Sequence, residues 1–150
     1  MNAGRDPAWY LEGQVPDTID GRFDMIAAVL TLVLLRLEAE GEATRTPSVL
    51  LTELFIDDMD GSIRQLGIGD IVVGKHIGKM MGALGGRLTT FRAEITGGGN
   101  FTGPASRNIF RDAPPNAAAL AFVSDRLLGF SRKLQEIPAG TILRGELPSL

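Results

Sequence analysis

The stretch "IDGRFDMIAAVLTLVLLRLEAE", residues 19–40, decides the fold class of this 150-residue chain. It contains the longest apolar run of the sequence, Met25 to Leu35, which is interrupted only by Thr31. Apolar residues recur at helical spacing on one side of this segment and also cover much of the remaining surface, which is typical of a helix buried at the centre of a protein. The run is about half of the roughly 20 residues that are needed to span a bilayer. It therefore predicts the central helix of a soluble bundle.

Helical periodicity continues on both sides of this segment, and no convincing alternating strand pattern is present. Asp17, Thr18 and Asp20 are candidates to cap the central helix, and Gly41 ends it. Thr46 or Ser48 is expected to cap the helix that follows. The predicted helices besides the central one are at about 7–12, 46–66, 72–95 and 116–136. Residues 96–108 read as a glycine-rich loop and 139–150 as a tail that lies against the bundle. The sequence predicts an all-α protein, a single domain of about five to six helices.

Composition limits the classes of function. The chain is 44% apolar and 22% charged, as in an ordinary soluble globular protein, and its length suits one domain. A net charge of −3 gives no general attraction to nucleic acid or anionic lipid, so we expect no DNA partner. The absence of cysteine rules out disulfides and thiolate chemistry and fits a reducing compartment. Because the first residues also lack the apolar run of a secretory signal, we expect a cytoplasmic protein, at most peripheral to the inner face of the membrane.

The segment "GDIVVGKH", residues 69–76, comes within one residue of a phosphate-binding loop. Such a loop requires a strand before its first glycine and a Ser or Thr hydroxyl for Mg²⁺ after its lysine. Here a helix and a short turn are predicted before Gly69, and His76 takes the hydroxyl position. A nucleotide-binding enzyme is therefore only the third hypothesis. Asp70 is expected to cap the next helix, and His76 to lie at the surface or at a helix edge.

The acidic segment "FIDDMDG", residues 55–61, also resembles catalytic and metal-binding motifs. Its spacing fits neither an EF-hand nor the DDxxD motif of prenyl synthases. One histidine and no cysteine make a transition-metal site improbable. No catalytic residue, cofactor or metal is predicted.

The helical wheel separates the acids of this segment. Asp57 lies on a polar face, where Asp60 and Arg64 form an i,i+4 pair. Leu54 and Phe55 belong to the predicted core stripe of this helix, and Asp58 is expected between them on the apolar side, where a carboxylate requires a partner. Arg87 is the first candidate partner, followed by Lys75 or the amides of residues 67–70.

Four glycines, Gly74, Gly78, Gly82 and Gly85, lie on one strip of the helix predicted at 72–95. Interior glycine costs about 1 kcal/mol relative to alanine, so a compensating contact is expected. Tight packing inside the bundle is the first interpretation. The second is a groove for a partner helix, beside which Lys75 and Lys79 form a small basic patch.

Between residues 15 and 88 the chain carries the marks "PDT.DGRFD", "DDMD.S.R..G.GD..VGK" and "GRL". In these it resembles the ubiquinol–cytochrome c chaperone family. The matching positions are Asp17, Gly21, Arg22, Phe23, Asp24, Asp57, Asp58, Met59, Asp60, Arg64, Gly67, Gly69, Asp70, Lys75, Gly86 and Arg87. A basic residue is usual in the family where His76 stands, and larger residues are common where "GKMMGALGGR" has glycines. Both departures weaken the local basic charge that a ribosome contact would use.

The resemblance implies an all-helical, non-enzymatic assembly factor for the cytochrome bc1 complex that binds newly made or unassembled cytochrome b. Mitochondrial members act near the ribosome with a small partner protein, so a helper protein is an expected partner here too. Residues 1–150 would form one chaperone domain, with a family-like core at about 15–96 and a C-terminal helix at about 116–136. The candidate contact or structural residues are Asp17, Arg22, Asp24, Asp57, Asp58, Asp60, Arg64, Asp70, Lys75, Lys79 and Arg87.

A second hypothesis from another class is a helical protein that binds a small molecule, a lipid or a quinone. A large closed apolar cavity with convergent acids would favour it, and a filled core would not.

Overall fold

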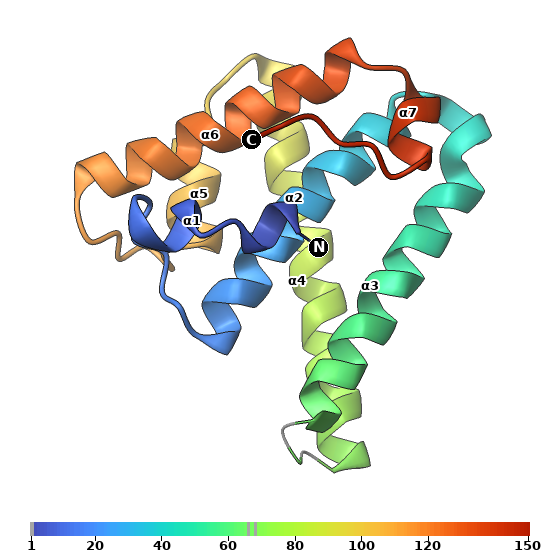
Figure 1. Ribbon diagram of the computed structural model, residues 1–150, viewed down its shortest axis with the longest axis vertical. Helices are drawn as coiled ribbons and strands as arrows, with labels where there is room; N and C mark the ends of the chain where they lie inside the picture. Colours follow the sequence, from blue (N-terminus) through green and yellow to red (C-terminus); the bar gives the residue numbers. More distant parts are fainter. Residues whose placement is uncertain (1, 66, 68) are drawn as a thin grey trace.

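A computed structural model of the chain describes residues 2–65, 67 and 69–150, and for Asp70 the backbone alone. The described residues form helices and no strand (Figure 1), which confirms the predicted all-α class. In chain order the elements are η1 (Ala3–Arg5), α1 (Ala8–Leu11), α2 (Ile19–Glu38), η2 (Gly41–Thr44), α3 (Arg45–Gln65), α4 (Asp70–Gly97), α5 (Thr102–Asn108), α6 (Ala117–Glu136) and α7 (Ala139–Leu143).

The predicted central helix is α2. Fourteen of its 20 residues are buried, and it packs against α4, α6 and the N-terminal turn η1. Thr18 is its N-cap, because the Thr18 hydroxyl oxygen accepts a hydrogen bond from the amide of Gly21 at 3.1 Å. The hydroxyl of Thr31, the polar interruption of the apolar run, donates to the carbonyl of Ala27 at 2.7 Å. An apolar helix with its one internal hydroxyl satisfied can be buried on nearly every side.

One side of α2 lies in a filled core with α6. Phe91 of α4, Phe101 and Ile109 complete this core together with Trp9 of α1, and all four side chains are at most 2% exposed. The predicted cap of α6 is confirmed, since Asn116 Oδ1 accepts from the Ala119 amide at 2.8 Å. This half of the molecule is the compact body of the fold.

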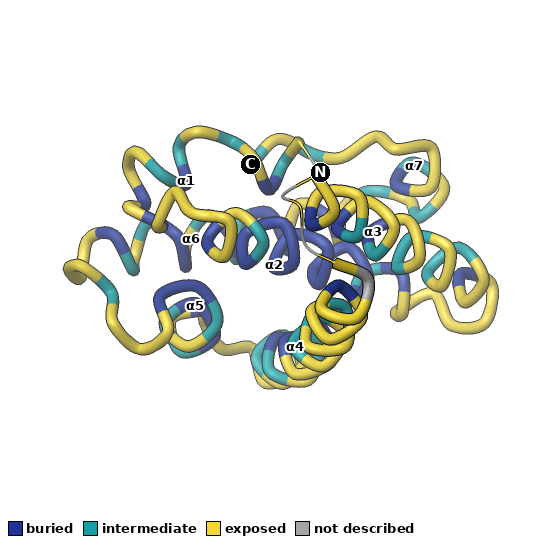
Figure 2. The backbone as a smooth tube through the Cα atoms, turned by 90° about the horizontal axis from the view of Figure 1, so that it is seen from below, coloured by how far each residue is buried: buried dark blue, intermediate teal, exposed yellow. Residues whose placement is uncertain are grey.

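The helices α3 and α4 form a hairpin that extends away from the body at the lower end of Figure 1. At about 1.5 Å per residue, the 28 residues of α4 are about 42 Å long. The middle parts of both helices pack on α2 around Phe55, Met59 and Leu84, whereas the connected ends of the hairpin are largely exposed (Figure 2). The predicted helix–turn–helix from Asp57 to Arg87 is therefore present in the described residues.

The segment predicted as a loop, residues 96–108, contains helix α5. Phe101, the N-cap, is fully buried, and Asn100 just before it accepts a hydrogen bond through Oδ1 from the Thr102 amide at 3.0 Å, so an apolar anchor and a local side-chain hydrogen bond begin this helix. Pro104 lies in its first turn, where the missing amide hydrogen is tolerated. The tail likewise contains a short helix, α7, of five residues.

Two helix starts also differ from the prediction. Helix α3 begins at Arg45, so Thr46 and Ser48 lie in its first turn and neither is its cap. Helix α4 begins at Asp70 with Gly69 as N-cap, one residue before the expected cap. In both cases several neighbouring residues could serve as the N-cap, and the sequence does not show which of them does.

Candidate functional site

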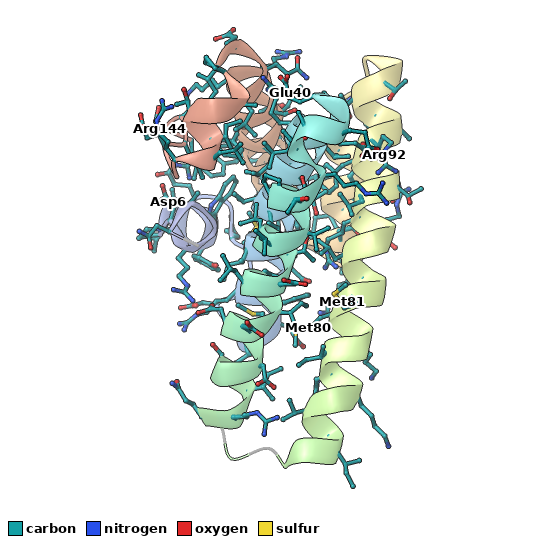
Figure 3. All side chains as sticks on the ribbon, turned by 90° about the vertical axis from the view of Figure 1, so that its right-hand side faces the viewer. Asp6, Glu40, Met80, Met81, Arg92 and Arg144 are labelled. Atoms are coloured by element: carbon teal, nitrogen blue, oxygen red, sulfur yellow. The ribbon has the colours of Figure 1, made fainter. Side chains whose placement is uncertain are left out.

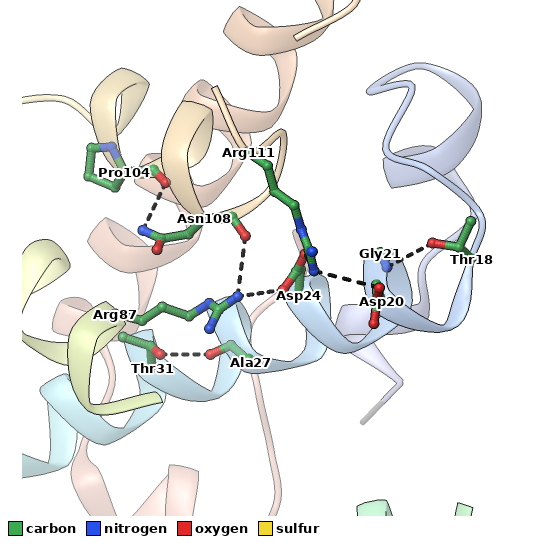
Figure 4. A network of polar contacts seen from close by, with 10 residues as sticks. All are labelled: Thr18, Asp20, Gly21, Asp24, Ala27, Thr31, Arg87, Pro104, Asn108 and Arg111. Carbon is green, nitrogen blue, oxygen red and sulfur yellow. Dashed lines mark hydrogen bonds and ion pairs between the residues drawn. The ribbon is translucent and has the colours of Figure 1, made fainter. Parts of the chain in front are cut away.

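Two of the family-type residues, Asp24 of α2 and Arg87 of α4, form a buried ion pair (Figure 4). Arg87 Nη2 donates to Asp24 Oδ1 and, at 3.3 Å, to the carbonyl of Asn108. The side chains of the pair are 3% and 7% exposed, and the Arg87 guanidinium lies 5.5 Å from the ring centroid of Phe23. The pair therefore ties together α2, α4 and α5 at the base of the hairpin.

A second arginine, Arg111, reaches the same carboxylate from the surface. Its Nη2 lies 3.4 Å from Asp24 Oδ2 and 3.9 Å from Asp20 Oδ2. Arg111 and the next residue, Asp112, have φ angles of 52° and 60°, a left-handed conformation that is uncommon for residues with side chains. This turn places the Arg111 guanidinium over the end of the buried pair.

Burial and pairing have opposite effects on the pKa values of Asp24 and Arg87. Desolvation raises the pKa of Asp24, whereas Arg87 and then Arg111 lower it, and the burial effect is the larger. Desolvation likewise lowers the pKa of Arg87, and the charge of Asp24, which raises it, is the smaller effect. Because two guanidinium groups already occupy the Asp24 carboxylate, this network acts as a structural link between helices and offers no free base.

The predicted partner of Asp58 is wrong. Asp58 Oδ2 lies 3.7 Å from Arg5 Nη2, with the two side chains 46% and 52% exposed, and Arg87 is engaged by Asp24. The reason is the orientation of α3. Leu54, one turn before Asp58, is 64% exposed, so this side of the helix faces away from the filled core.

Among the remaining family-type residues Gly21 and Met59 are buried, whereas the charged ones with described side chains lie at separate places on the surface and do not converge. Arg22 pairs with Asp17 at 2.7 Å, and the predicted i,i+4 pair of Asp60 and Arg64 is confirmed at 3.0 Å. The other candidates, Asp57, Lys75 and Lys79, are exposed on the hairpin, while the side chain of Asp70 lies outside the described residues. The motif thus marks one structural network and several separate surface positions.

Tight packing does not explain the glycine strip. A Cβ atom built on Gly74, Gly78, Gly82 or Gly85 would have no neighbouring atom within 4 Å. The strip lies on the exposed side of α4, which Figure 3 shows beside α3 with Met80 and Met81 labelled. The first interpretation of these glycines is therefore wrong.

A groove of about 690 Å³ lies between α2, α3 and the C-terminal segment. One wall, which is also the buried floor of the groove, is a row along α2, formed by Ile26, Val29, Leu30, Val33 and Leu37. The facing wall is a row along α3, formed by Pro47, Leu50, Leu51, Leu54, Phe55 and Asp58. The third wall is formed by Ile142, Leu143, Gly145 and Leu147. We call this feature the α2–α3 groove.

The α2–α3 groove is open to solvent along its length. Leu50, Leu54, Leu143 and Leu147 are 53%, 64%, 47% and 40% exposed. It is therefore unlike the closed apolar cavity that would favour a small-molecule protein. Sequence reasoning missed this site because Leu54 was placed in the core. The signal was the width of the apolar surface of α3, since Leu50, Leu51 and Leu54 extend beyond the buried stripe of Phe55, Met59 and Ile63.

The described residues give no support to the phosphate-loop hypothesis. Residues 45–65, before the first glycine of the motif, are helical, and α4 follows directly after Gly69. His76 is exposed on α4, as predicted. In the described part of the chain, no group of three or more His, Cys, Asp or Glu residues is arranged to hold a metal ion. Among the described helices, none combines the length and the apolar character that crossing a bilayer requires.

Fold and site together define an all-helical protein that presents an open apolar groove. The family model described as "Ubiquinol-cytochrome C chaperone" matches residues 11–147, and the chain belongs to this family. The matched range extends on both sides of residues 15–88, where the motifs are concentrated. The fold is also similar to the crystal structure of the Cbp3 homolog from Brucella abortus, with a TM-score of 0.83 and 27% sequence identity over 99% of this chain and 83% of that chain. A comparison with curated proteins found no match.

Proposed function

We propose that this chain is a non-enzymatic assembly chaperone for the cytochrome bc1 complex and that it binds newly made or unassembled cytochrome b. The observation that carries the proposal is the match of the chaperone family to residues 11–147, nearly the whole chain. The similarity to the Brucella abortus structure over 99% of the chain supports the same assignment. Neither comparison names the client, so cytochrome b is part of the proposal.

The surface of the molecule suits such a role. An unassembled membrane subunit exposes apolar helices, and a chaperone needs an apolar surface that the client can enter and leave. The α2–α3 groove supplies partly exposed leucines above a buried apolar floor. We place the protein in the cytoplasm, at the inner face of the membrane. The surface pairs Asp17–Arg22 and Asp60–Arg64, together with Lys75 and Lys79, are candidates for contacts with the client or with a helper protein.

A deletion strain tests the proposed function. Loss of the gene should lower the amount of assembled bc1 complex, measured on native gels and by the absorbance of b-type haem in membranes. Plasmid-borne wild-type protein should restore it. Normal bc1 levels in the deletion strain would contradict the proposal.

Co-purification tests the client. Tagged protein isolated from membranes under mild conditions should bring cytochrome b with it, identified by mass spectrometry. The amount should be greater when a later assembly step is blocked, because unassembled cytochrome b then accumulates. Absence of cytochrome b under both conditions would contradict binding.

A further inference from the structure

We infer that the α2–α3 groove binds one apolar α-helix of about three turns, the end of a membrane-spanning segment, with the Lys or Arg residues that flank it placed beside Asp58. The inference rests on the proposed function for the source of this helix. It identifies the chemistry of the ligand and the place and direction in which it lies, which the family assignment leaves open.

The spacing of the two walls is that of helix packing. The α3 row follows Pro47, Leu50, Leu51, Leu54 and Asp58, at positions i, i+3, i+4, i+7 and i+11. The α2 row repeats the same spacing from Ile26 to Leu37. Rows of this kind are the ridges against which a third helix packs. The 11-residue span of each row corresponds to about 16 Å, or about three helical turns.

Burial differs between the floor and the rim of the groove. On the floor, Ile26, Val29 and Val33 are 5–6% exposed and form a fixed surface. On the rim, Leu50 and Leu54 of α3 are more than half exposed, and the partly exposed Leu143 and Leu147 line the same groove. A ligand that covered only the floor would leave these leucines in water. A helix that occupies the length of the groove would contact both.

The charge of the groove favours a cation at one end. Asp58 is the one charged residue among the described residues that line it, and the exposed Asp57 is next to it. Two cations lie nearby. Arg5 pairs with Asp58 itself at 3.7 Å, and because both side chains are about half exposed, a cation of the ligand can compete with Arg5 for this carboxylate. Arg144 pairs with Glu146 at 3.0 Å. Membrane-spanning segments carry an excess of Lys and Arg at their cytoplasmic ends. An apolar helix that ends in cations therefore matches the groove in both shape and charge.

A second copy of the chain is a poorer ligand. The exposed large apolar residues outside the groove and its rim are, among the described residues, Leu11, Ile19, Val49, Ile71, Val72 and Met81. They are distributed over α1, α2, α3 and α4 and form no row of three turns. A second copy thus has no free apolar helix to offer.

Peptide binding to the purified full-length protein tests the inference. The probes are two dye-labelled helical peptides of about 14 residues, with one Leu/Ala face and either two Lys or two Glu at one end. Fluorescence anisotropy should show roughly tenfold tighter binding of the Lys-ended peptide. Asp58→Lys should abolish or reverse this preference. Equal binding of the two peptides to wild-type protein would overturn the inference.

Matched variants locate the site. Leu50→Glu/Leu54→Glu changes two exposed side chains of the groove and should weaken binding of the Lys-ended peptide roughly tenfold or more. Leu11→Glu changes a side chain of another surface that is 77% exposed and should leave the affinity unchanged. Circular dichroism and thermal unfolding establish that each variant is folded. An unchanged affinity in the double variant, or an equal loss in Leu11→Glu, would overturn the site.

Cross-linking in cells separates this inference from the proposed function. A photoreactive amino acid at position 54 should cross-link to a membrane-spanning segment, and the same group at position 11 should not. A product with cytochrome b supports both proposals. A product with a membrane-spanning segment of another identified protein, together with normal bc1 levels in the deletion strain, supports the groove and contradicts the proposed function. A product with a second copy, or a lipid or quinone that displaces the peptide, would overturn the inference and leave the deletion result standing.

Discussion

Helices α3 and α6 are almost equal in length, with 21 and 20 residues, but their apolar side chains have opposite surroundings. In α6, Val123, Leu127 and Leu134 are fully buried against α2 and α5. In α3, only Phe55, Met59 and Ile63 are buried, while Leu50 and Leu54 are more than half exposed. The comparison shows that apolar content does not by itself determine burial. A second row of leucines outside the packed stripe marks a surface that the fold leaves open.

The largest expected effect comes from the link between the body and the hairpin that contains α3. Asp24→Ala removes the counter-charge of Arg87 from a buried site, and Arg87 cannot be neutralised by losing a proton. We expect the free energy of unfolding to fall by about 3–5 kcal/mol, measured by urea denaturation at pH 7. A loss within about 0.5 kcal/mol would show that the hairpin does not depend on this link.

Changing the other partner of the pair should produce a pH-dependent effect. Arg87→Met removes a charge that lowers the pKa of Asp24, so this pKa should rise further above its ordinary value of 3.8. An acid whose pKa is raised by folding holds its proton more tightly in the folded state. Its favourable contribution is present below the unfolded pKa and is lost as pH rises through the folded pKa. The variant should therefore lose more stability relative to wild type at pH 7 than at pH 4. The opposite trend would contradict the assignment.

Truncation of one leucine in each helix tests the comparison directly. Leu127→Ala opens a cavity in the filled core of α6 and should lower the free energy of unfolding by about 2–5 kcal/mol. Leu54→Ala changes a side chain that is 64% exposed and should stay within about 0.5 kcal/mol of wild type. Chemical denaturation of both variants is the measurement. Similar losses would mean that the two helices are packed alike.

The starts of the same helices should also respond differently. Asn116→Ala removes the side chain that caps α6 and should destabilise the protein by about 1 kcal/mol. Ser48→Ala lies in the first turn of α3, where no side-chain cap from this residue is present, and should change stability by less than about 0.5 kcal/mol. Thermal unfolding of the two variants distinguishes them. A larger effect of Ser48→Ala would contradict the assigned cap of α6.

The smallest expected effect is a gain in stability. Gly82→Ala adds a methyl group in open space on the exposed side of α4 and should stabilise the protein by about 0.4–1 kcal/mol. Calorimetry of the variant tests this. Destabilisation would indicate a close contact at this strip that the isolated chain does not show. Retained stability with a loss of bc1 assembly would identify the strip as a partner surface.

The long helices could be predicted from sequence because their evidence is local. Apolar period, the caps Thr18 and Asn116, and the glycines between segments place α2, α3, α4 and α6 within a few residues. Helix α5 was missed because Gly103 and Pro104 suggested a loop, whereas the burial of Phe101 is a tertiary effect. Sequence thus supplied the elements and left open how some of them pack.

The site depends on which side of each helix meets another element, and periodicity does not show this. The wheel placed Leu54 and Asp58 on the packed side of α3, although that side forms the rim of the groove. A stronger signal for the buried carboxylate was present in α2. Asp24 lies between Phe23 and Met25 at the start of an almost wholly apolar helix, so it was the better candidate to pair with Arg87. The third wall of the groove is formed by a C-terminal segment that has no apolar periodicity, so the sequence pattern gave no indication of it.

The central claim is that α3 keeps its leucines out of the core in order to bind a client. Complementation of the deletion strain with Leu50→Glu/Leu54→Glu protein, beside Leu11→Glu protein as the control, tests this claim most directly. We predict that both variants unfold within about 0.5 kcal/mol of wild type, that the control restores assembled bc1 complex, and that the double variant does not. Full restoration of bc1 by the folded double variant would contradict the claim.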